Sequence, residues 1–299
     1  MRLRSWLFVP GDDERKLARA AGVDADVLIL DLEDAVAASA KAVARGRVRE
    51  FVAARSVRAG TRLFVRINPF DGPEAVADLD AVMAARPDGI VQPKVRSPSD
   101  VLGLGAALAR LESQHELAGG STRILPIATE TPEALFTLGG YAACGPRLCG
   151  LTWGAEDLAT AVGAMTHTGD DGVWTAPFQL ARSLCLFGAA AAGVAAIDTL
   201  QANFRDTGAL QASCAAAVRD GFSGKLAIHP DQVAVINAGF TPSAEQLAHA
   251  RRVVALFRDH PGAAALSLEG RMLDRPHLVQ AERILARAGE AASGLAPER

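Results

Sequence analysis

The chain has 299 residues, of which 49% are hydrophobic and 22% are charged, and its formal net charge at pH 7 is −3. This composition allows a large apolar core, and it excludes the strongly basic surface that binding to nucleic acid or to an acidic membrane requires. The longest uncharged apolar stretch, residues 183–197, is shorter than the roughly 20 residues that span a bilayer, so we expect no membrane partner.

The chain has four cysteines and no CxxC spacing among them. We therefore expect them to be buried and reduced, as small apolar side chains in a reducing compartment. The apolar run that follows Arg4 is too short for the hydrophobic region of a signal peptide. These features together predict a cytoplasmic protein.

Eight short apolar runs alternate with eight helical patterns along the chain. Glycine, proline or a polar cluster bounds most of the runs, which is typical of strands. We expect strands at residues 5–11, 26–32, 61–68, 89–95, 124–129, 148–152, 195–198 and 225–229. We expect helices at residues 12–22, 40–54, 73–85, 97–116, 132–143, 178–192, 209–220 and 243–259, with a longer polar connection at 159–175.

These strands are nearly continuous in apolar residues, which favours parallel strands that are covered on both faces. Eight alternating strand and helix units predict an α/β fold, a (β/α)8 TIM barrel. We place the barrel catalytic domain at residues 1–259. Residues 260–299 follow the closure of the barrel and are predicted to form a C-terminal helical arm or lid, with a last helix at 276–288.

Acidic residues gather where three of the predicted strands end. In a parallel barrel these carboxyl ends share one rim, and that rim carries the chemistry. The acids are Asp31, Glu33 and Asp34 at the end of the second strand, Glu130 after the fifth, and Glu156 and Asp157 after the sixth. Carboxylates from several strands suit a hard cation such as Mg²⁺, with Mn²⁺ as a possible substitute. The alternative is a set of salt bridges at the rim.

Basic side chains are predicted to reach the same rim. Arg66 and Asn68 lie at the end of the third strand, and the planar fork of Arg66 suits a substrate carboxylate. Lys94 lies near the end of the fourth strand. Neighbouring acids would keep it protonated, which disfavours the alternative of a Schiff base with a carbonyl substrate. His229 ends the eighth strand and is expected to fix a turn or to contact a ligand. We expect Arg66, Glu33, Asp34, Lys94 and His229 to bind substrate or cofactor.

Seven motifs occur in order along nearly the whole chain. They are RSWLFVPG (4–11), LILDLEDAV (28–36), VRIN (65–68), PKV (93–95), TWGAEDL (152–158), AIHP (227–230) and EGRMLDRPH (269–277). Together they resemble the citrate lyase beta-subunit-like proteins of the HpcH/HpaI aldolase group.

The resemblance implies a metal-dependent barrel, a homotrimer or hexamer, that makes or breaks a carbon–carbon bond next to a coenzyme A thioester. It implies that Glu130 and Asp157 bind Mg²⁺ and that Arg66 holds a 2-keto acid. It also implies that Asp274 is a catalytic acid, supplied by the C-terminal arm of a neighbouring subunit. The chain departs from the usual motifs of this family at two places, at Thr131–Ala134 after the fifth strand and at Gln92 before Pro93. Neither departure removes any of these residues.

The expected activity is therefore that of a Mg²⁺-dependent carbon–carbon lyase. It would cleave a 3-hydroxyacyl-CoA, such as malyl-CoA or citramalyl-CoA, into acetyl-CoA and a 2-keto acid, or condense them. One alternative is a thioesterase that acts on the same acyl-CoA. A second is the beta subunit of a citrate lyase complex, which acts on a carrier-bound thioester. A third, a non-catalytic scaffold, is disfavoured because Arg66 and all the acids are present.

Overall fold

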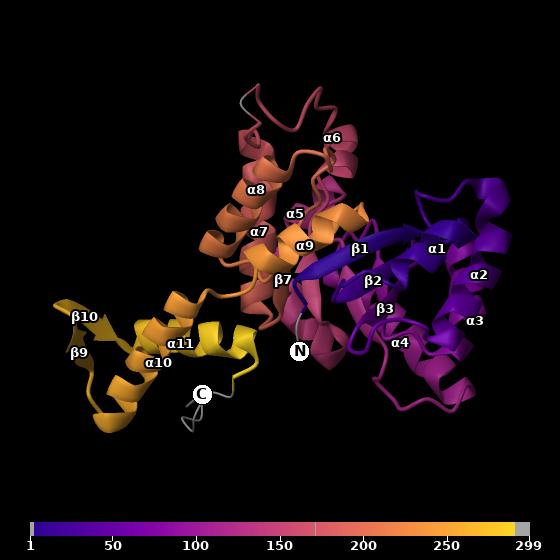
Figure 1. Cartoon of the computed structure of the whole chain (residues 1–299). Coiled ribbons are helices and arrows are strands. Elements are labelled where there is room, and N and C mark those ends of the chain that lie inside the picture. The colour runs from indigo at the N-terminus through magenta and orange to yellow at the C-terminus, as the bar shows by residue number, and fades with distance from the viewer. Residues whose placement is uncertain (1–2, 171, 291–299) are drawn as a thin grey trace. The chain divides into compact units, whose positions relative to one another are not determined.

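The computed structural model describes residues 3–170 and 172–290 of the chain (Figure 1). The described residues divide into two compact units, one formed by residues 3–237 and the other by residues 238–290. Neither unit contains, among its described residues, a helix long and apolar enough to cross a membrane. All four cysteines are free thiols, as expected, and three of them are buried: Cys144, Cys185 and Cys214.

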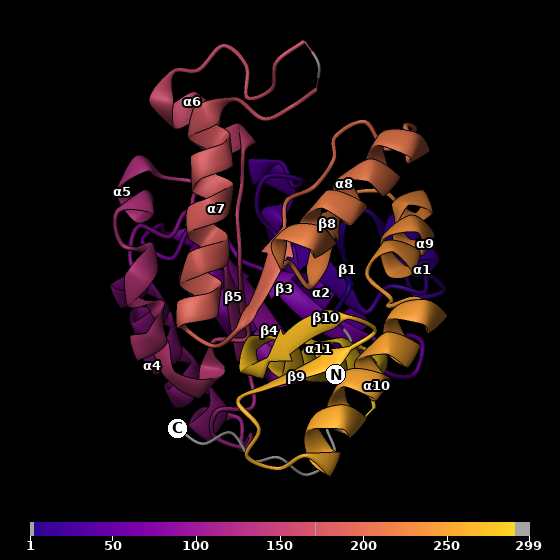
Figure 2. The ribbon, with the colours of Figure 1, turned by 90° about the vertical axis from the view of Figure 1, so that its left-hand side faces the viewer.

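The first unit is built on eight parallel strands in the order β5-β4-β3-β2-β1-β8-β7-β6. Figure 2 labels β1, β3, β4, β5 and β8 among them. The strands are β1 (Ser5–Pro10), β2 (Val27–Asp31), β3 (Arg62–Arg66), β4 (Gly89–Gln92), β5 (Arg123–Pro126), β6 (Gly150–Thr152), β7 (Ala195–Asp198) and β8 (Gly224–Ala227). Bridges between Ile124 and Leu148, and between Ile127 and Thr152, join the two edge strands. The sheet is therefore closed, and the predicted (β/α)8 barrel is confirmed.

Large apolar side chains fill the interior of the barrel, because every second residue of a strand points to the same face. The indole of Trp6 packs edge-on against Phe64, with ring centroids 5.1 Å apart. Both belong to one buried cluster: Trp6, Val27, Ile29, Phe64, Val91, Leu125, Ile127, Ile197 and Leu226. Each fully buried side chain of this size stabilises the fold by roughly 1.5–3 kcal/mol. The barrel is a packed core, so ligands must bind at its rim.

The helices of the first unit alternate with the strands, as predicted. They are α1 (Glu14–Ala20), η1 (Ala38–Ala40), α2 (Lys41–Ala54), α3 (Glu74–Val82), η2 (Met83–Ala85), α4 (Pro98–Gln114), α5 (Pro132–Leu135), η3 (Leu138–Arg147), α6 (Glu156–Val162), α7 (Ala176–Ala191) and α8 (Thr207–Asp220), followed by α9 (Pro230–Gly239). Residues 132–143 were expected to form one α-helix. Instead a short α-turn precedes a 3-10 segment that is kinked at Gly145 and Pro146, where glycine and proline interrupt regular helix.

Two helices were not predicted. Helix α6 begins where the sixth strand was expected to end in acids, and Glu156 and Asp157 form its first turn. Acids are favourable there because they face the positive end of the helix dipole. Helix α9 begins directly at Pro230, a residue that is well suited to a first helical position.

The second unit contains α10 (Ala244–Asp259), β9 (Ala265–Leu268), β10 (Arg271–Asp274) and α11 (Arg275–Ala288). Strands β9 and β10 form an antiparallel hairpin that the sequence analysis did not predict; Glu269 and Gly270 turn it, both with positive φ. The two helices and the hairpin bury one apolar core: Ala250, Val253, Val254, Phe257, Leu273, Leu278, Ala281 and Leu285.

The expected division of the chain after residue 259 differs from the division into compact units. Helix α10 was assigned to the barrel domain, but its apolar face packs in the core of the second unit. The division between the compact units lies after Asn237. The last part of the expected arm, residues 291–299, lies outside the described residues.

Candidate active site

The carboxyl ends of β2 and β3 place Asp31 beside Arg66. The two residues are paired in register across the neighbouring strands. Arg66 donates from Nε to Oδ1 of Asp31 at 2.8 Å and from Nη2 to Oδ2 at 2.6 Å. Burial alone would lower the pKa of Arg66, but the hydrogen bonds to Asp31 and the charge of Glu33 raise it above its usual value. The guanidinium is therefore a fixed positive charge.

Glu33 is buried between two cations. Its Oε2 lies 2.8 Å from Nη1 of Arg66, and its Oε1 lies 2.9 Å from Nζ of Lys94. Burial raises the pKa of this carboxyl, and the charges of Arg66 and Lys94 oppose that shift. Oε2 has no hydrogen-bond partner among the described residues, so its contact with Nη1 of Arg66 is an ion pair without hydrogen-bond geometry. Glu33 therefore links the Arg66 end of the site to Lys94.

Lys94 lies at the centre of the acidic residues. Its Nζ is 2.9 Å from Oδ1 of Asp157 and 3.3 Å from Oδ2 of Asp34, in addition to its contact with Glu33. Burial lowers the pKa of its ammonium, but the hydrogen bonds to Asp157 and Glu33 outweigh burial and raise it. A protonated amine has no lone pair for attack on a carbonyl, so this environment disfavours a Schiff base at Lys94.

The backbone of Lys94 is also unusual. Its φ is +53°, in the left-handed region that few residues other than glycine adopt. In this conformation its backbone N–H donates to Oε2 of Glu130 at 2.5 Å. Positive φ at a non-glycine residue costs roughly 1 kcal/mol or more and persists where the surrounding structure imposes it. Lys94 thus holds Glu130 through its main chain and Asp157 through its side chain.

Glu130 is a buried carboxyl with little solvation. Burial raises its pKa to about 8, and the nearby charge of Asp157 adds to the shift, while the N–H and ammonium of Lys94 oppose it. Gly154 packs directly against it: a Cβ at this position would lie 2.9 Å from Cγ of Glu130. The glycine makes room for the carboxyl, and a cation at the carboxylate would offset the cost of its burial.

Asp157 lies in the first turn of α6, and its side chain is 37% exposed. Together with Glu130 it offers hard carboxylate oxygens that a divalent cation can use. No group of three or more His, Cys, Asp or Glu side chains that could hold a metal occurs in the described part of the chain. Two carboxylates are nevertheless enough for Mg²⁺, which usually keeps waters and substrate oxygens as its other ligands. The residues therefore fit this ion.

Other polar residues near the strand ends have structural roles. Asn68 donates from Nδ2 to the carbonyl of Leu32 and to Asp78, which ties the end of β3 to α3. Glu156 is exposed, next to Asp157. Of the predicted site residues, the structure brings together Arg66, Glu33, Asp34, Lys94, Glu130 and Asp157 through contacts centred on Lys94.

His229 lies outside these contacts, at the junction of β8 and α9. Its ring stacks on Phe204, with centroids 4.4 Å apart and planes 15° apart. It helps to line a pocket whose wall also includes Phe8, Lys16 and Arg19. The guanidinium carbon of Arg66 lies 4.7 Å from the centroid of the Phe8 ring, so Phe8 both lines this pocket and contacts Arg66.

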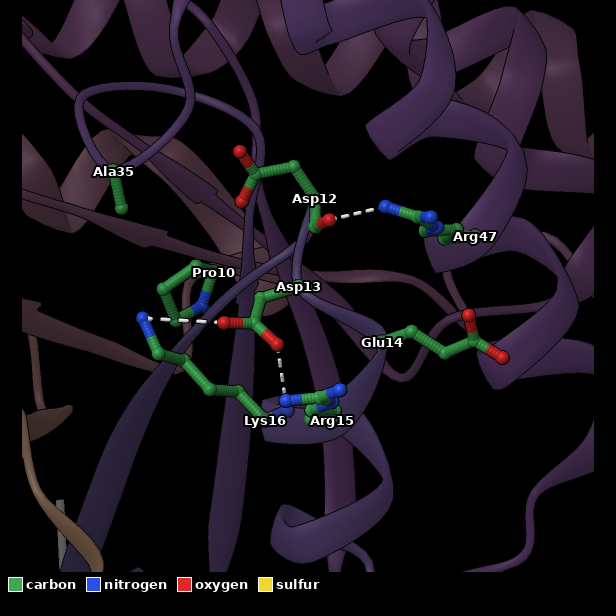
Figure 3. A pocket seen from close by; sticks show the side chains of 8 residues that line it. All are labelled: Pro10, Asp12, Asp13, Glu14, Arg15, Lys16, Ala35 and Arg47. Atoms are coloured by element: carbon green, nitrogen blue, oxygen red, sulfur yellow. Dashed lines mark hydrogen bonds and ion pairs between the residues drawn. The ribbon is translucent and has the colours of Figure 1, made fainter.

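A second pocket of about 480 Å³ lies where β1 leads into α1 (Figure 3). It mixes charges: Asp12, Asp13 and Glu14 line it together with Arg15, Lys16 and Arg47. Lys16 pairs with Asp13 at 3.5 Å, and Arg47 donates to the backbone carbonyl of Asp12. Neither pocket was predicted from the sequence, although Pro10, which lines both, precedes the turn at Gly11.

Asp274 belongs to the second unit, where it is the N-cap residue of α11. Its carboxyl is 38% exposed, and Oδ1 lies 2.5 Å from Nδ1 of His277. His277 was part of a quoted motif, but the sequence analysis gave it no role. Its position three residues after an N-cap acid was the available signal, because a side chain at that position can reach back to the cap.

Two family models match the chain. The model described as HpcH/HpaI aldolase/citrate lyase matches residues 4–230, which is most of the chain. The model described as a C-C bond lyase of the TIM-barrel fold matches residues 187–290. The first match includes Glu33, Arg66, Glu130 and Asp157, and the second includes Asp274.

Similar proteins extend over nearly the full chain. A citrate lyase subunit beta-like protein from Mycobacterium tuberculosis is 35% identical over 96% of this chain and 96% of its own length. A (3S)-malyl-CoA thioesterase from Cereibacter sphaeroides is 33% identical over 95% of this chain and 94% of its own. The crystal structure of CitE from M. tuberculosis, in complex with magnesium, acetoacetate and coenzyme A, superposes with a TM-score of 0.76, at 33% identity and covering 96% of this chain and 98% of that one.

Proposed function

This chain belongs to the HpcH/HpaI aldolase/citrate lyase family, and we propose that it is a Mg²⁺-dependent carbon–carbon lyase acting on a 3-hydroxyacyl-CoA. The substrate would be malyl-CoA, citramalyl-CoA or a close relative, and the products acetyl-CoA and a 2-keto acid. The observation that carries this proposal is the arrangement around Lys94, where Arg66, Glu130 and Asp157 converge at one rim of the barrel. A fixed cation suits the carboxylate of the substrate, and a neighbouring metal site made of carboxylate oxygens suits its hydroxyl and carboxylate oxygens.

Glu130 and Asp157 would hold Mg²⁺, which acts when bound as a Lewis acid toward the hydroxyl and carboxylate oxygens that become the keto acid. Asp34 and Lys94 border this position, and Lys94 offsets the negative charge of the surrounding acids. The CitE structure, at 33% identity, is described as a complex with magnesium and coenzyme A, which supports both ligands for this chain.

Arg66 would bind the substrate carboxylate through one edge of its guanidinium. Asp31 occupies the Nε and Nη2 edge with two hydrogen bonds. Glu33 lies 2.8 Å from Nη1 but makes no hydrogen bond there, so N–H groups on Nη1 and Nη2 remain as donors for a substrate carboxylate. In this arrangement Asp31 orients the fork, and the positive charge lies where negative charge develops in the transition state.

The pocket beside Phe8 is the proposed position of the thioester and its coenzyme A. Phe8 contacts Arg66, and the pocket carries Lys16, Arg19 and the ring of His229 on its wall. Its two cations suit phosphate groups. The neighbouring pocket at the start of α1 is lined by three acids and three cations, whose charges offset each other.

We also propose that the site is completed between subunits. Asp274 would protonate the acetyl-CoA enolate, and it belongs to a unit with its own apolar core. Such a unit can serve the barrel of a neighbouring copy, in a homotrimer or hexamer. A cytoplasmic location is consistent with the four free cysteines.

One alternative function has direct support. The (3S)-malyl-CoA thioesterase from C. sphaeroides is 33% identical to this chain over 95% of its length, nearly as similar as the citrate lyase beta-like relative. A thioesterase would hydrolyse the same acyl-CoA to a free hydroxy-diacid and coenzyme A, with water as the nucleophile.

A panel of 3-hydroxyacyl-CoA thioesters, incubated with Mg²⁺ and analysed for both products, tests the proposal. A lyase releases a 2-keto acid together with acetyl-CoA, whereas a thioesterase releases free thiol and no keto acid. A chelator should abolish turnover, and Mg²⁺ or Mn²⁺ should restore it. Full activity after chelation, with substrate trapped on Lys94 by borohydride, would overturn the metal mechanism in favour of a Schiff base.

A further inference from the structure

Asp274 and His277 form a close pair at the start of α11. Asp274 is the N-cap residue, and His277 lies in the first turn of the helix. Nδ1 of His277 is 2.5 Å from Oδ1 of Asp274, and the backbone N–H of Asp274 donates to the same Nδ1 at 3.2 Å. The side chains are 38% and 45% exposed, so the pair remains accessible to a ligand.

The geometry of the pair constrains its protons. A nitrogen and a carboxyl oxygen only 2.5 Å apart must share a proton, because two lone pairs at this distance would repel. When Nδ1 accepts from the backbone N–H of Asp274, the shared proton lies on Oδ1. When the proton lies on Nδ1, that backbone hydrogen bond is lost, His277 donates to Oδ1, and the other carboxyl oxygen, Oδ2, can carry or release a second proton. His277 is the only side chain that forms a hydrogen bond or ion pair with Asp274 in the part of the chain that the structure describes.

The backbone on both sides of the pair is held by the core of the second unit. Leu273 precedes Asp274 and is buried, and Leu278 follows His277 and is buried in the same cluster. Pro276, between them, has a restricted φ, which further limits the first turn of α11. The carboxyl and the imidazole are therefore presented together by a rigid segment.

We propose that His277 is a positioning residue for proton transfer from Asp274, an inference that rests on the proposed function. When the carbon–carbon bond of the substrate breaks, its electron pair remains on the acetyl-CoA enolate. The O–H bond of Asp274 then breaks, and its proton forms a C–H bond with that electron pair. The resulting carboxylate accepts a charge-assisted hydrogen bond from Nδ1–H of His277, and solvent afterwards returns a proton to Asp274.

Three variants separate this role from helix capping. His277→Ala removes the donor and should lower kcat roughly 10- to 100-fold, with little change in KM. His277→Asn can place an amide N–H near the position of Nδ1 and should recover most of the activity. His277→Gln, whose amide reaches the position of Nε2 instead, should not. Equal losses in the Asn and Gln variants would contradict a role for Nδ1.

A double-mutant cycle with Asp274→Asn tests whether His277 acts through the acid. The double variant should be no slower than Asp274→Asn alone, because the imidazole then has no carboxyl to position. If the double variant instead loses kcat by the product of the two single losses, the inference is overturned. If Asp274→Asn is itself fully active, the proposed role of Asp274 fails. If Asp274→Asn is inactive while His277→Ala is unimpaired, only the role of His277 fails.

A spectroscopic measurement tests the pair without substrate. In protein labelled with ¹⁵N-histidine, the His277 resonances, identified by their loss in His277→Asn, should show a protonated Nδ1. In Asp274→Asn, where the carboxylate is absent, this signature should weaken or shift. An unprotonated Nδ1 in the unsubstituted protein would contradict the proposed donor, whatever the activity.

Discussion

At the scale of single residues, the site depends on charges that compensate each other at short range. Arg66 and Lys94 are separated in sequence from the acids they contact, yet Glu33 contacts both at 2.8 and 2.9 Å. Breaking one member of such a buried set leaves the others unpaired, which typically costs several kcal/mol. The free-energy cost of a substitution here should therefore exceed the loss of one contact, and the costs of two substitutions should not add independently.

Arg66→Lys tests the guanidinium fork. Lysine keeps the charge but cannot reproduce two parallel hydrogen bonds to Asp31 together with further N–H donors for the substrate. We expect kcat/KM for the acyl-CoA substrate to fall by roughly two to four orders of magnitude, or about 3–5 kcal/mol of transition-state stabilisation. Steady-state kinetics measure this change.

Arg45→Lys is a matched control for Arg66→Lys. Arg45 also pairs with two acids, Asp78 at 2.7 Å and Glu74, but outside the proposed site. Its substitution should change thermal stability more than kcat/KM. If Arg66→Lys has unchanged kinetics, Arg66 is only a salt-bridge residue of the rim.

At the scale of elements, buried ion pairs tie helices to the strands they cover. Glu112 on α4 accepts two hydrogen bonds from Arg147, at 2.7 and 2.6 Å, and others from the backbone N–H groups of Gly120 and Thr122. Burial alone would raise its pKa, but these hydrogen bonds lower the pKa to about 2. They join the end of α4 to β5 and to the segment before β6.

Glu112→Gln should make the pH dependence of this link visible. The pKa is lower in the folded protein than the ordinary value of 4.5, so the stabilisation is complete above about pH 4.5 and is lost as the pH falls toward about 2. At pH 7 the substitution should lower the free energy of unfolding by about 3 kcal/mol. The difference between the two proteins should shrink below pH 4.5, as measured by urea unfolding at several pH values.

Glu116→Gln provides the control on the same segment, because Glu116 is exposed. It should change the free energy of unfolding by no more than about 0.5 kcal/mol. A cost for Glu112→Gln that is the same at pH 7 and at pH 3 would show that the ionised carboxylate is not what stabilises this region.

At the scale of the whole molecule, the chain consists of a barrel unit and a smaller unit that each bury their own core. The barrel carries Arg66 and the proposed metal ligands, and the smaller unit carries Asp274. A chain with this division can complete a site within one copy or between copies. The two cases differ in how inactive variants complement each other.

Mixing Arg66→Ala with Asp274→Asn distinguishes the two cases. If the acid comes from a neighbouring subunit, some mixed sites contain both an intact Arg66 and an intact Asp274. After subunit exchange at equal amounts, we expect recovery of up to about a quarter of the unsubstituted activity, because each group is intact with a chance of about one half. The assay is turnover before and after exchange.

Subunit exchange must be shown independently, for example by mass spectrometry of differently labelled copies. Each variant alone should remain poorly active and should still bind Mn²⁺. An absence of recovery after complete exchange would place Asp274 with the barrel of its own chain.

The sequence by itself determined the barrel, because eight apolar runs separated by helical patterns have few other ways to bury both faces of a parallel sheet. It also located the acids and Arg66 near strand ends, since residues that leave a parallel strand must emerge at one rim. Those inferences depend only on local pattern and on the shared direction of the strands. The site roles themselves remain predictions.

The tertiary structure decided what the pattern of residues could not. It showed that Asp31 occupies one edge of the Arg66 guanidinium, that the backbone of Lys94 adopts positive φ to hold Glu130, and that α10 packs with the second unit. It also brought His277 to Asp274. Such features depend on side-chain distances of a few ångström and on the packing of segments distant in sequence, neither of which periodicity or composition encodes.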